Sequence, residues 1–269
     1  MGKDIFNLKD KVVVLTGGLG LIGLNYVRAL AERGAQVVII DMVPEATAKK
    51  SLDLNIERKN RKNIFYFQGT ITDRAALLEI KKMVLTRFHH IDVLINNAAL
   101  NPKVEKSSRL HSAGVTFEEY PLSDWEKELQ VNLTGTMLCC QIFGSAMKSG
   151  ASIINISSTY GIVAPDQSMY PKGFIKPATY GVSKGAIITL TKYLASYWGK
   201  KGIRVNCVAP GGVSNGQEQS FIKKYSAKTP LGRMARPDEY NGIIVYLASD
   251  ASSYASGALF TIDGGWTAW

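Results

Sequence analysis

The chain contains little cysteine. Cys139, Cys140 and Cys207 are the three cysteines among 269 residues, and two of them are neighbours in the sequence. This number and spacing exclude the disulfide framework that holds many small secreted domains together. We therefore expect reduced cysteines that act as small apolar packing residues.

Long hydrophobic runs are also absent. No apolar run approaches the roughly 18–20 residues of a membrane-spanning helix, and the opening MGKDIFNLKD lacks the apolar core of a secretion signal. With 46% hydrophobic and 20% charged residues, the composition is that of an ordinary globular protein, which excludes disordered and collagen-like chains. We expect a soluble, cytoplasmic protein without a membrane partner.

Acidic residues are fewer than basic ones. The chain has 22 Asp and Glu against 32 Lys and Arg, a net charge of +10, which would suit nucleic acid, a membrane surface or an anionic small molecule. The densest basic cluster, Arg58, Lys59, Arg61 and Lys62, contains no aromatic residue and favours a solvated helix end. We predict no nucleic-acid partner, and an anionic substrate stays open.

Short runs rich in β-branched residues recur along the chain, and the stretches between them carry apolar residues at helical spacing. This alternation predicts an α/β protein, a doubly wound seven-stranded parallel sheet with helices on both faces. No linker or repeat divides the chain, so we expect one domain over 1–269. The predicted strands are 12–15, 37–40, 64–67, 93–95, 153–156, 205–208 and 259–262.

Two segments, 100–121 and 162–178, are longer than ordinary connections and follow predicted strand ends. Ligands bind at the carboxyl ends of strands in open α/β sheets, so these segments are candidate walls of a substrate pocket. Tolerated surface insertions are the alternative.

A glycine-rich loop, residues 16–23, follows the first predicted strand. Glycines at 17, 20 and 23 permit a tight turn and a close approach of backbone N–H groups to a pyrophosphate at a helix N-terminus. Asp41 ends the second predicted strand, where a carboxylate binds the ribose hydroxyls of NAD and repels the extra phosphate of NADP. We predict NAD as the preferred cofactor; the alternative for Asp41 is an ordinary strand-end or capping role.

Tyr180 and Lys184 lie four residues apart, hence on one face of a helix. A free phenol is a poor base at neutral pH, but a fixed cation nearby favours the phenolate and suits it to general acid–base catalysis. By itself this spacing also fits an unrelated surface pair.

Several motifs occur together in a fixed order. They are the glycine loop, Asn96-Asn-Ala-Ala99, Asn132 within Val131-Asn-Leu-Thr-Gly135, Ile156-Ser-Ser158, Tyr180 with Lys184, Pro210-Gly211 and Asp263-Gly-Gly265. In this set the chain resembles the short-chain dehydrogenase/reductase family over residues 9–267, in its branch of about 250 residues. A looser similarity connects it with members of bacterial sugar and flagellin-glycan metabolism, such as flagellin modification protein A.

The resemblance implies a catalytic group of Asn132, Ser158, Tyr180 and Lys184, with Ser157 structural. Tyr180 would exchange a proton with the substrate oxygen while hydride passes to or from the nicotinamide. Lys184 would bind the nicotinamide ribose and lower the tyrosine pKa, Ser158 would bind the substrate oxygen, and Asn132 would hold a relay water. Asn96 would also line the cofactor, and the implied cofactor contacts are Gly17, Gly20, Leu21, Ile22, Gly23, Asp41, Met42, Thr70, Ile71, Asn97, Ala98, Ala99, Tyr180, Lys184, Pro210, Gly211 and Val213.

The chain departs from the family pattern in three places. Its glycine spacing, TGxxGxxG, is that of the extended nucleotide-sugar branch, and Thr70 replaces an Asp that often contacts adenine. The 162–178 insertion lengthens the interval between Ser158 and Tyr180. If that insertion loops outward the catalytic ends still meet, and Tyr160, Asp166 and Tyr170 become part of the substrate wall.

From this we predict an NAD-dependent oxidoreductase (EC 1.1.1.-) for a secondary alcohol or ketone, a sugar or sugar derivative. The alternatives are an epimerase or dehydratase of a nucleotide sugar, a 3-oxoacyl thioester reductase, and a non-catalytic NAD-binding protein. No metal site is expected. Gly181-Val-Ser-Lys-Gly185 fits the hydrolase elbow GxSxG, but no strand precedes Ser183 and no histidine follows it, so we regard the match as accidental.

Long helices are expected over 123–147, opened by a capping box at Ser123 and Glu126, and over 179–198. Both carry apolar residues on more than one face. Family members commonly pair through these helices, which implies a homodimer or homotetramer. Residues 212–230 match the family's mobile lid, and we expect them to be poorly ordered without ligand.

Overall fold

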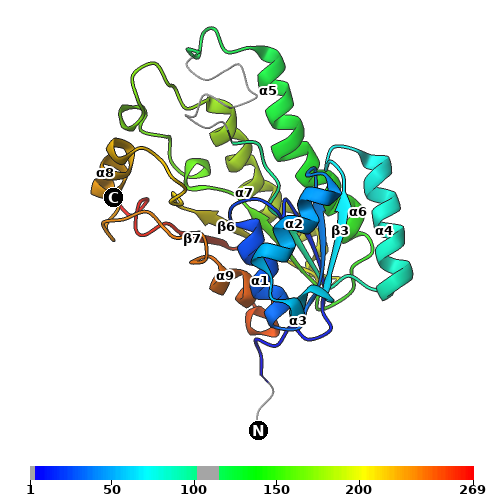
Figure 1. Ribbon diagram of the computed structural model, residues 1–269. Coiled ribbons are helices and arrows are strands. Elements are labelled where there is room, and N and C mark those ends of the chain that lie inside the picture. The colour runs from blue at the N-terminus through cyan, green and yellow to red at the C-terminus, as the bar shows by residue number, and fades with distance from the viewer. Residues whose placement is uncertain (1–3, 102–114) are drawn as a thin grey trace.

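The computed structural model describes residues 4–101 and 115–269. In these residues a parallel sheet has the order β3-β2-β1-β4-β5-β6-β7 (Figure 1). The strand predictions are confirmed to within two residues at each end. The strands are β1 Val12–Thr16, β2 Gln36–Asp41, β3 Ile64–Gln68, β4 Val93–Asn96, β5 Ser152–Ile156, β6 Arg204–Pro210 and β7 Leu259–Ile262.

Helices cover both faces of the sheet (Figure 1). On one face α1 and α9 pack over the strands, and on the other face α4, α6 and α7 do so. The α-helices are α1 Gly23–Glu32, α2 Glu45–Asn55, α3 Arg58–Arg61, α4 Arg74–Phe88, α5 Leu122–Leu129, α6 Thr136–Gly144, α7 Ala178–Gly199, α8 Gln219–Lys228 and α9 Asn241–Ala248. Short turns of other helix types are η1 Gln130–Gly135, which is a π-helix, and the 3₁₀-helices η2 Thr159–Gly161, η3 Gln167–Met169 and η4 Asp250–Ser252.

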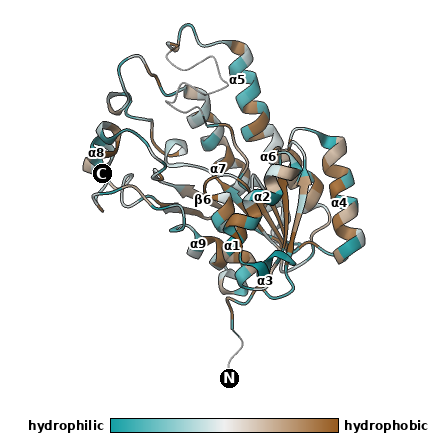
Figure 2. Ribbon diagram, viewed as in Figure 1, coloured by the Kyte–Doolittle hydropathy of each residue, from teal (hydrophilic) through white to brown (hydrophobic). Residues whose placement is uncertain are grey.

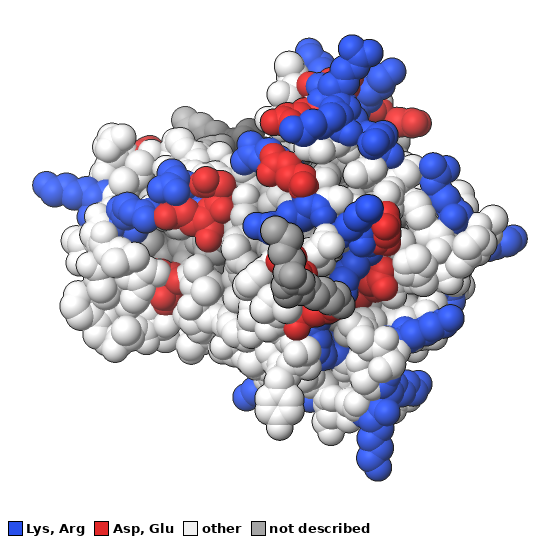
Figure 3. All heavy atoms as spheres, turned by 90° about the horizontal axis from the view of Figure 1, so that it is seen from below, with Lys and Arg blue, Asp and Glu red and all other residues white. Residues whose placement is uncertain are grey.

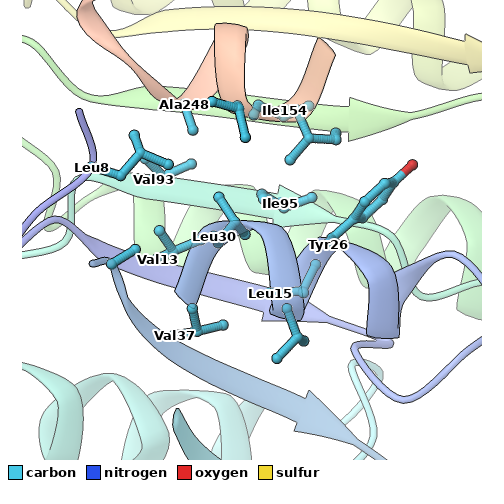
Figure 4. Packing of buried hydrophobic residues seen from close by; sticks show 14 of the residues in the cluster. Leu8, Val13, Leu15, Tyr26, Leu30, Val37, Val93, Ile95, Ile154 and Ala248 are labelled. Atoms are coloured by element: carbon cyan, nitrogen blue, oxygen red, sulfur yellow. The ribbon is translucent and has the colours of Figure 1, made fainter. Parts of the chain in front are cut away.

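The strands are apolar because both of their faces are buried. Tyr26 and Leu30 of α1 lie over Val13 and Leu15 of β1, and Tyr26 lies toward the carboxyl ends of the strands (Figure 4). Burying a side chain of this size contributes about 1.5–3 kcal/mol. The brown strands and the teal outer surfaces of helices such as α4 and α5 show the same division in Figure 2. The buried core therefore fixes the sheet on which the site is built.

The strand order changes direction at β1: β2 and β3 follow on one side of β1, and β4 to β7 follow on the other. Thr16, at the end of β1, is paired with Ile40 of β2 on one side and with Asn96 of β4 on the other. In a doubly wound sheet the crevice for a ligand opens at this switch point, beyond the carboxyl ends of the strands. The glycine loop and residues 96–99 therefore meet there.

The helix that contains Asn132 corrects the capping-box prediction. α5 begins at Leu122 directly after Pro121, and no side-chain hydrogen bond caps it, so Ser123 lies inside the helix. Proline already has the backbone angle that suits the start of a helix. The helix continues through the π-helical η1 into α6 and ends at Gly144.

Basic and acidic side chains are interspersed on the face shown in Figure 3. In the predicted basic cluster, Arg61 pairs with Asp53 at 2.7 Å and Lys59 with Glu57 at 2.8 Å. The three cysteines are free and buried, as expected. In the described part of the chain, no helix combines the length and apolar character needed to cross a membrane.

Candidate active site

The glycine loop is held against the end of β4 by contacts too close for a larger residue. Gly17 has φ +65°, and a Cβ built on it would lie 2.7 Å from Cα of Ala98. The Gly17 N–H bonds to the Ile40 carbonyl at 2.8 Å, and Asn97 Nδ2 donates to the Gly17 carbonyl at 2.8 Å. Gly23 begins α1 just beyond the loop, so that the N-terminus of the helix faces the switch point.

Asp41 lies beside this loop. Its carboxylate accepts hydrogen bonds from the backbone N–H of Leu19 at 3.0 Å and of Val43 at 3.3 Å. Asp41 therefore binds backbone N–H groups, as the alternative of a capping role expects. A carboxylate has further lone pairs, so it can accept ribose hydroxyls while it holds the loop.

The residues predicted to contact the cofactor at the end of β4 face in different directions. Asn96 is 3% exposed and donates to Asn155 Oδ1 at 2.8 Å, so the expectation that Asn96 lines the cofactor is wrong. Side chains alternate along a strand, and Asn96 points into the core on the side of α6, where it also contacts Cys140. The backbone N–H groups of Asn97 and Ala98 both bond to Thr16 Oγ1 at 3.1 Å, which fixes the turn beside the glycine loop.

The other predicted cofactor residues differ in their exposure and contacts. Leu21, Met42 and Ala99 are exposed, whereas Ile71 is buried against Gly135. Thr70 Oγ1 lies 2.8 Å from Thr72 Oγ1 and shapes the turn after β3. At the far end Pro210 closes β6, Gly211 bonds to Ile262 at 2.9 Å, and Val213 forms a bridge with Ala235.

Asn132 lies in the π-helical turn η1, a helix type that is often found at functional sites. Its carboxamide accepts the N–H of Leu100 at 2.7 Å and donates to the Leu100 carbonyl at 3.0 Å. It also contacts Ser183 Oγ at 3.3 Å. Asn132 thus connects the segment after β4 with α7.

Ser158 and Tyr180 are brought together where β5 ends against α7. The Ser158 side chain lies close enough to Tyr180 to act on its pKa, and Ser157 Oγ donates to the Lys184 carbonyl at 2.7 Å. Gly161 permits this approach, because a Cβ on it would lie 2.7 Å from the carbonyl carbon of Lys184. Sequence reasoning missed Gly161. Ser183 lies within α7, so the GxSxG match is accidental.

The charges around Tyr180 differ from the expectation. Burial raises the pKa of Tyr180 to about 12, and the Ser158 side chain acts in the opposite direction. Lys184 is 4% exposed, donates to the Ile156 carbonyl at 2.8 Å, and has a pKa lowered to about 8 by burial. The net shift of the Tyr180 pKa is thus upward, with burial as its largest cause, and the lowering of this pKa by Lys184 stays a prediction.

A second lysine, which sequence reasoning did not select, lies against the same tyrosine. Lys176 Nζ is 4.5 Å from the centre of the Tyr180 ring, and Lys184 Nζ is 5.8 Å from it. Lys176 lies near the end of the 162–178 insertion. Its position four residues before Tyr180 could have suggested that the two side chains are neighbours. Helical spacing does not apply there, because Pro177 lies between them and α7 begins only at Ala178.

Tyr170 and Phe174 of this insertion form an aromatic wall with residues of η2 and α8. The wall is defined here as Tyr160, Tyr170, Phe174, Phe221 and Tyr225. Tyr160 and Tyr170 share a hydrogen bond between their hydroxyls at 2.9 Å, and the Tyr170 ring contacts Phe174 and Phe221 at 5.1 and 5.5 Å. Tyr160 and Tyr170 thus lie together in this group, and their contact with substrate stays a prediction. The insertion does not simply loop outward, because it packs on α8.

Asp166 was expected in the same wall, but it pairs with Lys228 of α8 and so lies at the outer contact of the insertion. The 212–230 segment contains α8, and its mobility stays a prediction. The predicted wall at 100–121 lies outside the described residues over 102–114. Among the residues that are described, no group of three or more His, Cys, Asp or Glu side chains is placed to hold a metal ion.

Comparison with known proteins identifies this arrangement. A family profile described as enoyl-(acyl carrier protein) reductase matches residues 20–267. The chain is 33% identical to D-threitol dehydrogenase of Mycolicibacterium smegmatis, over 97% of this chain and 95% of that protein. It is 34% identical to a 3-alpha-(or 20-beta)-hydroxysteroid dehydrogenase of Mycobacterium bovis, over 96% of this chain and 90% of that protein.

A solved structure shows the same fold. A short-chain dehydrogenase from Leptospira borgpetersenii with bound NAD⁺ superposes with a TM-score of 0.84 at 31% identity, covering 99% of this chain and 96% of that chain. Polyol and hydroxysteroid dehydrogenases are thus among its relatives, and a nicotinamide dinucleotide is the cofactor of this group. The chain belongs to the short-chain dehydrogenase/reductase family and is an oxidoreductase of secondary alcohols and ketones.

Proposed function

We propose that this protein oxidises a secondary alcohol of a polyhydroxylated substrate, or reduces the corresponding ketone, with NAD in preference to NADP. The observation that carries the proposal is the placement of the Ser158 side chain close to Tyr180, beside two buried lysines. A proton donor, a hydroxyl ligand and cations in one place suit the chemistry of a carbonyl group.

The residues present fit the cofactor. Gly17 leaves bare backbone where a Cβ would collide with Ala98, and Asp41 lies beside the loop with free acceptor capacity. Gly17, Gly20 and Gly23 would admit the pyrophosphate, Asp41 the adenosine ribose, and Lys184 the nicotinamide ribose. When bound, a nicotinamide supplies the acceptor or donor of the hydride.

In the oxidative direction, Tyr180 would accept the proton of the substrate hydroxyl while the hydrogen on the same carbon leaves with its electron pair. Ser158 would donate a hydrogen bond to the substrate oxygen and fix its position. Lys184 would balance the charge on the phenolate, and Asn132 would hold the water through which the proton returns to solvent. In reduction the same proton moves from Tyr180 to the carbonyl oxygen.

The hydroxyls near Tyr180 favour a polyhydroxylated substrate over a purely apolar one. Tyr160 and Tyr170 lie close enough to act electrostatically on one another and on Tyr180. Phenol hydroxyls can both donate and accept hydrogen bonds, so they suit neighbouring hydroxyls of a sugar or sugar alcohol. The relative that oxidises D-threitol supports the same substrate class.

Net turnover tests this proposal. Purified protein with NAD and a panel of tetritols, hexitols and sugar phosphates should release NADH in proportion to alcohol consumed. A nucleotide-sugar epimerase would convert substrate without net NADH. A 3-oxoacyl thioester reductase would oxidise NADH only when a 3-oxoacyl thioester is offered as the substrate for reduction. Preference for a hydroxysteroid over every polyol would contradict the substrate class.

We also propose a homodimer or homotetramer formed through α7. This helix exposes Val182, Tyr193 and Tyr197 by 49%, 63% and 60%, and the two tyrosine rings are stacked at 6.0 Å. Such aromatic residues are enriched in protein interfaces. Light scattering should give a multiple of the 29.4 kDa chain mass for the wild type. The Tyr193→Glu variant should give a lower mass, because the charge disrupts the interface.

A further inference from the structure

Lys176 occupies a position at Tyr180 that the proposed mechanism does not use. Its side chain is 6% exposed although it carries an ammonium group, and the Nζ atom lies over the Tyr180 ring at 4.5 Å. Lysine is seldom buried to this degree without a partner. Its position therefore calls for an explanation in terms of its neighbours.

The backbone around Lys176 is fixed. The side chain of Gln167 accepts the Lys176 N–H at 2.9 Å and donates to the Lys176 carbonyl at 3.0 Å. At the other end of the side chain, Nζ donates to Asn101 Oδ1. These contacts come from two different segments, so the ammonium group is held at its place over the ring.

A buried carboxylate on α5 acts on this lysine. Glu128 is fully buried, accepts a hydrogen bond from the Tyr120 hydroxyl at 2.7 Å, and interacts electrostatically with Lys176. Its second oxygen has no hydrogen-bond partner among the described residues. Burial raises the pKa of the Glu128 carboxyl, while the Tyr120 bond and Lys176 act in the opposite direction. In its charged form Glu128 favours the protonated form of Lys176.

We propose that Lys176 is a positioning residue for catalysis, whose ammonium group, held over the ring by Gln167 and Asn101, stabilises the phenolate form of Tyr180. A cation over an aromatic face is attracted to the ring, and the attraction grows when the ring becomes a phenolate. Glu128 keeps the ammonium form populated. This inference rests on the proposed role of Tyr180 as the acid–base group, and it adds a second cation to that of Lys184.

The sign of the effect follows from the groups around the pair. Burial lowers the pKa of Lys176 to about 8, so the cation is present below that pH and is lost above it while Tyr180 remains a phenol. Once the phenolate forms, its charge holds the proton on Lys176. Among the described residues, the other titratable groups that act on Tyr180, Lys176 and Glu128 include Tyr160, Tyr170, Lys184, Tyr120 and Asp124.

The test needs a readout that does not depend on turnover. Tyr180 is replaced by a difluorotyrosine in the full chain, and the ionisation of that one phenol is followed by ¹⁹F NMR, with and without NAD. An opposite charge at this distance lowers a pKa by about 1–3. We expect the midpoint to rise by about one pH unit in Lys176→Met and Lys176→Gln, and to stay near the wild-type value in Lys176→Arg.

Lys172→Met is the matched control, because Lys172 is an exposed lysine of the same insertion. It should leave the midpoint unchanged. Glu128→Gln should move it in the same direction as Lys176→Met, by less, and an unchanged midpoint there would overturn the role of Glu128. Equal midpoints in wild type and both neutral Lys176 variants, with native circular dichroism, would overturn the proposal.

Kinetics separate this inference from the proposed function. With an active substrate, Lys176→Met should displace the pH profile of kcat to higher pH by about one unit and leave KM for NAD within a few-fold. If no polyol or other alcohol is turned over by wild type, the proposed function fails, and the NMR midpoints still decide the effect of Lys176 on Tyr180.

Discussion

Around the glycine loop most contacts are made by backbone atoms, whereas around Tyr180 they are made by buried charged and hydroxyl-bearing side chains. Gly17 bonds through its N–H and carbonyl, and Asp41 contributes the charge. On the substrate side, Lys176, Lys184 and Glu128 are all buried. Backbone contacts tolerate many side chains, whereas a buried charge depends on each partner. The substrate side should therefore be the more sensitive of the two to single substitutions.

The largest difference is expected at Tyr180. Tyr180→Phe removes the proton donor and little of the cofactor surface, so turnover should fall by about 10²–10⁴-fold while NAD affinity changes by only a few-fold. Tyr254→Phe is the control, since Tyr254 is a fully exposed tyrosine. Steady-state rates and NAD titration measure the two quantities. Comparable activity in both variants would remove Tyr180 from the mechanism.

A smaller change is expected on the cofactor side, at Asp41. Asp41→Ala removes hydrogen bonds to a charged group, each worth about 1.5–3 kcal/mol, so the preference for NAD over NADP should narrow by about tenfold or more. Asp41→Asn keeps the size of the side chain and removes the repulsion, and NADP should gain relative to NAD. The measurement is kcat/KM for each cofactor. An unchanged ratio in both variants would refute the assignment of Asp41.

Gly161 tests how closely the two regions are joined. In Gly161→Ala the new methyl group would collide with α7 at Lys184, and overpacking of this kind costs about 1–2 kcal/mol of stability. It should also separate Ser158 from Tyr180 and lower kcat. Gly199→Ala is the control, because Gly199 lies at the end of α7 and a Cβ there would meet open space. Thermal unfolding and kcat should fall together in the first variant and stay near wild type in the second.

The smallest effect is expected at the outer contact between the insertion and α8. Hydrogen bonds from Lys228 and Ser168, together with the charge of Lys228, lower the pKa of Asp166 to about 2. Because the folded-state pKa is depressed, the contribution of the pair is present above the ordinary carboxyl range and is lost as pH falls through about 2. Asp166→Asn should change activity by no more than a few-fold between pH 5 and 9. Hydrogen exchange in α8 should rise slightly in this variant, and a large loss of activity would show that Asp166 contacts substrate.

The same contrast explains how far the sequence could predict the structure. The strands were predictable because strands such as β1 are apolar on both faces, and the glycine loop because its spacing is local. Asn96 and Asn97 could not be separated, since their order does not show which one faces the core. Lys176 and Glu128 are 48 positions apart and meet only because α5 packs beside α7, which no local pattern shows.

The π-helical turn at Gln130–Gly135 has a consequence for how this segment can change. A π-turn accommodates one more residue than an α-turn, so deleting one residue there would restore a regular helix and rotate α6 by about 100° relative to α5. α5 contacts α7, while Phe143 of α6 is buried in the core on the face of the sheet that α6 and α7 share. A regular helix could keep only one of these two contacts in place. The widened turn thus sets the rotation of α6 relative to α5. Deleting a single residue within it should lower stability more than a conservative replacement does.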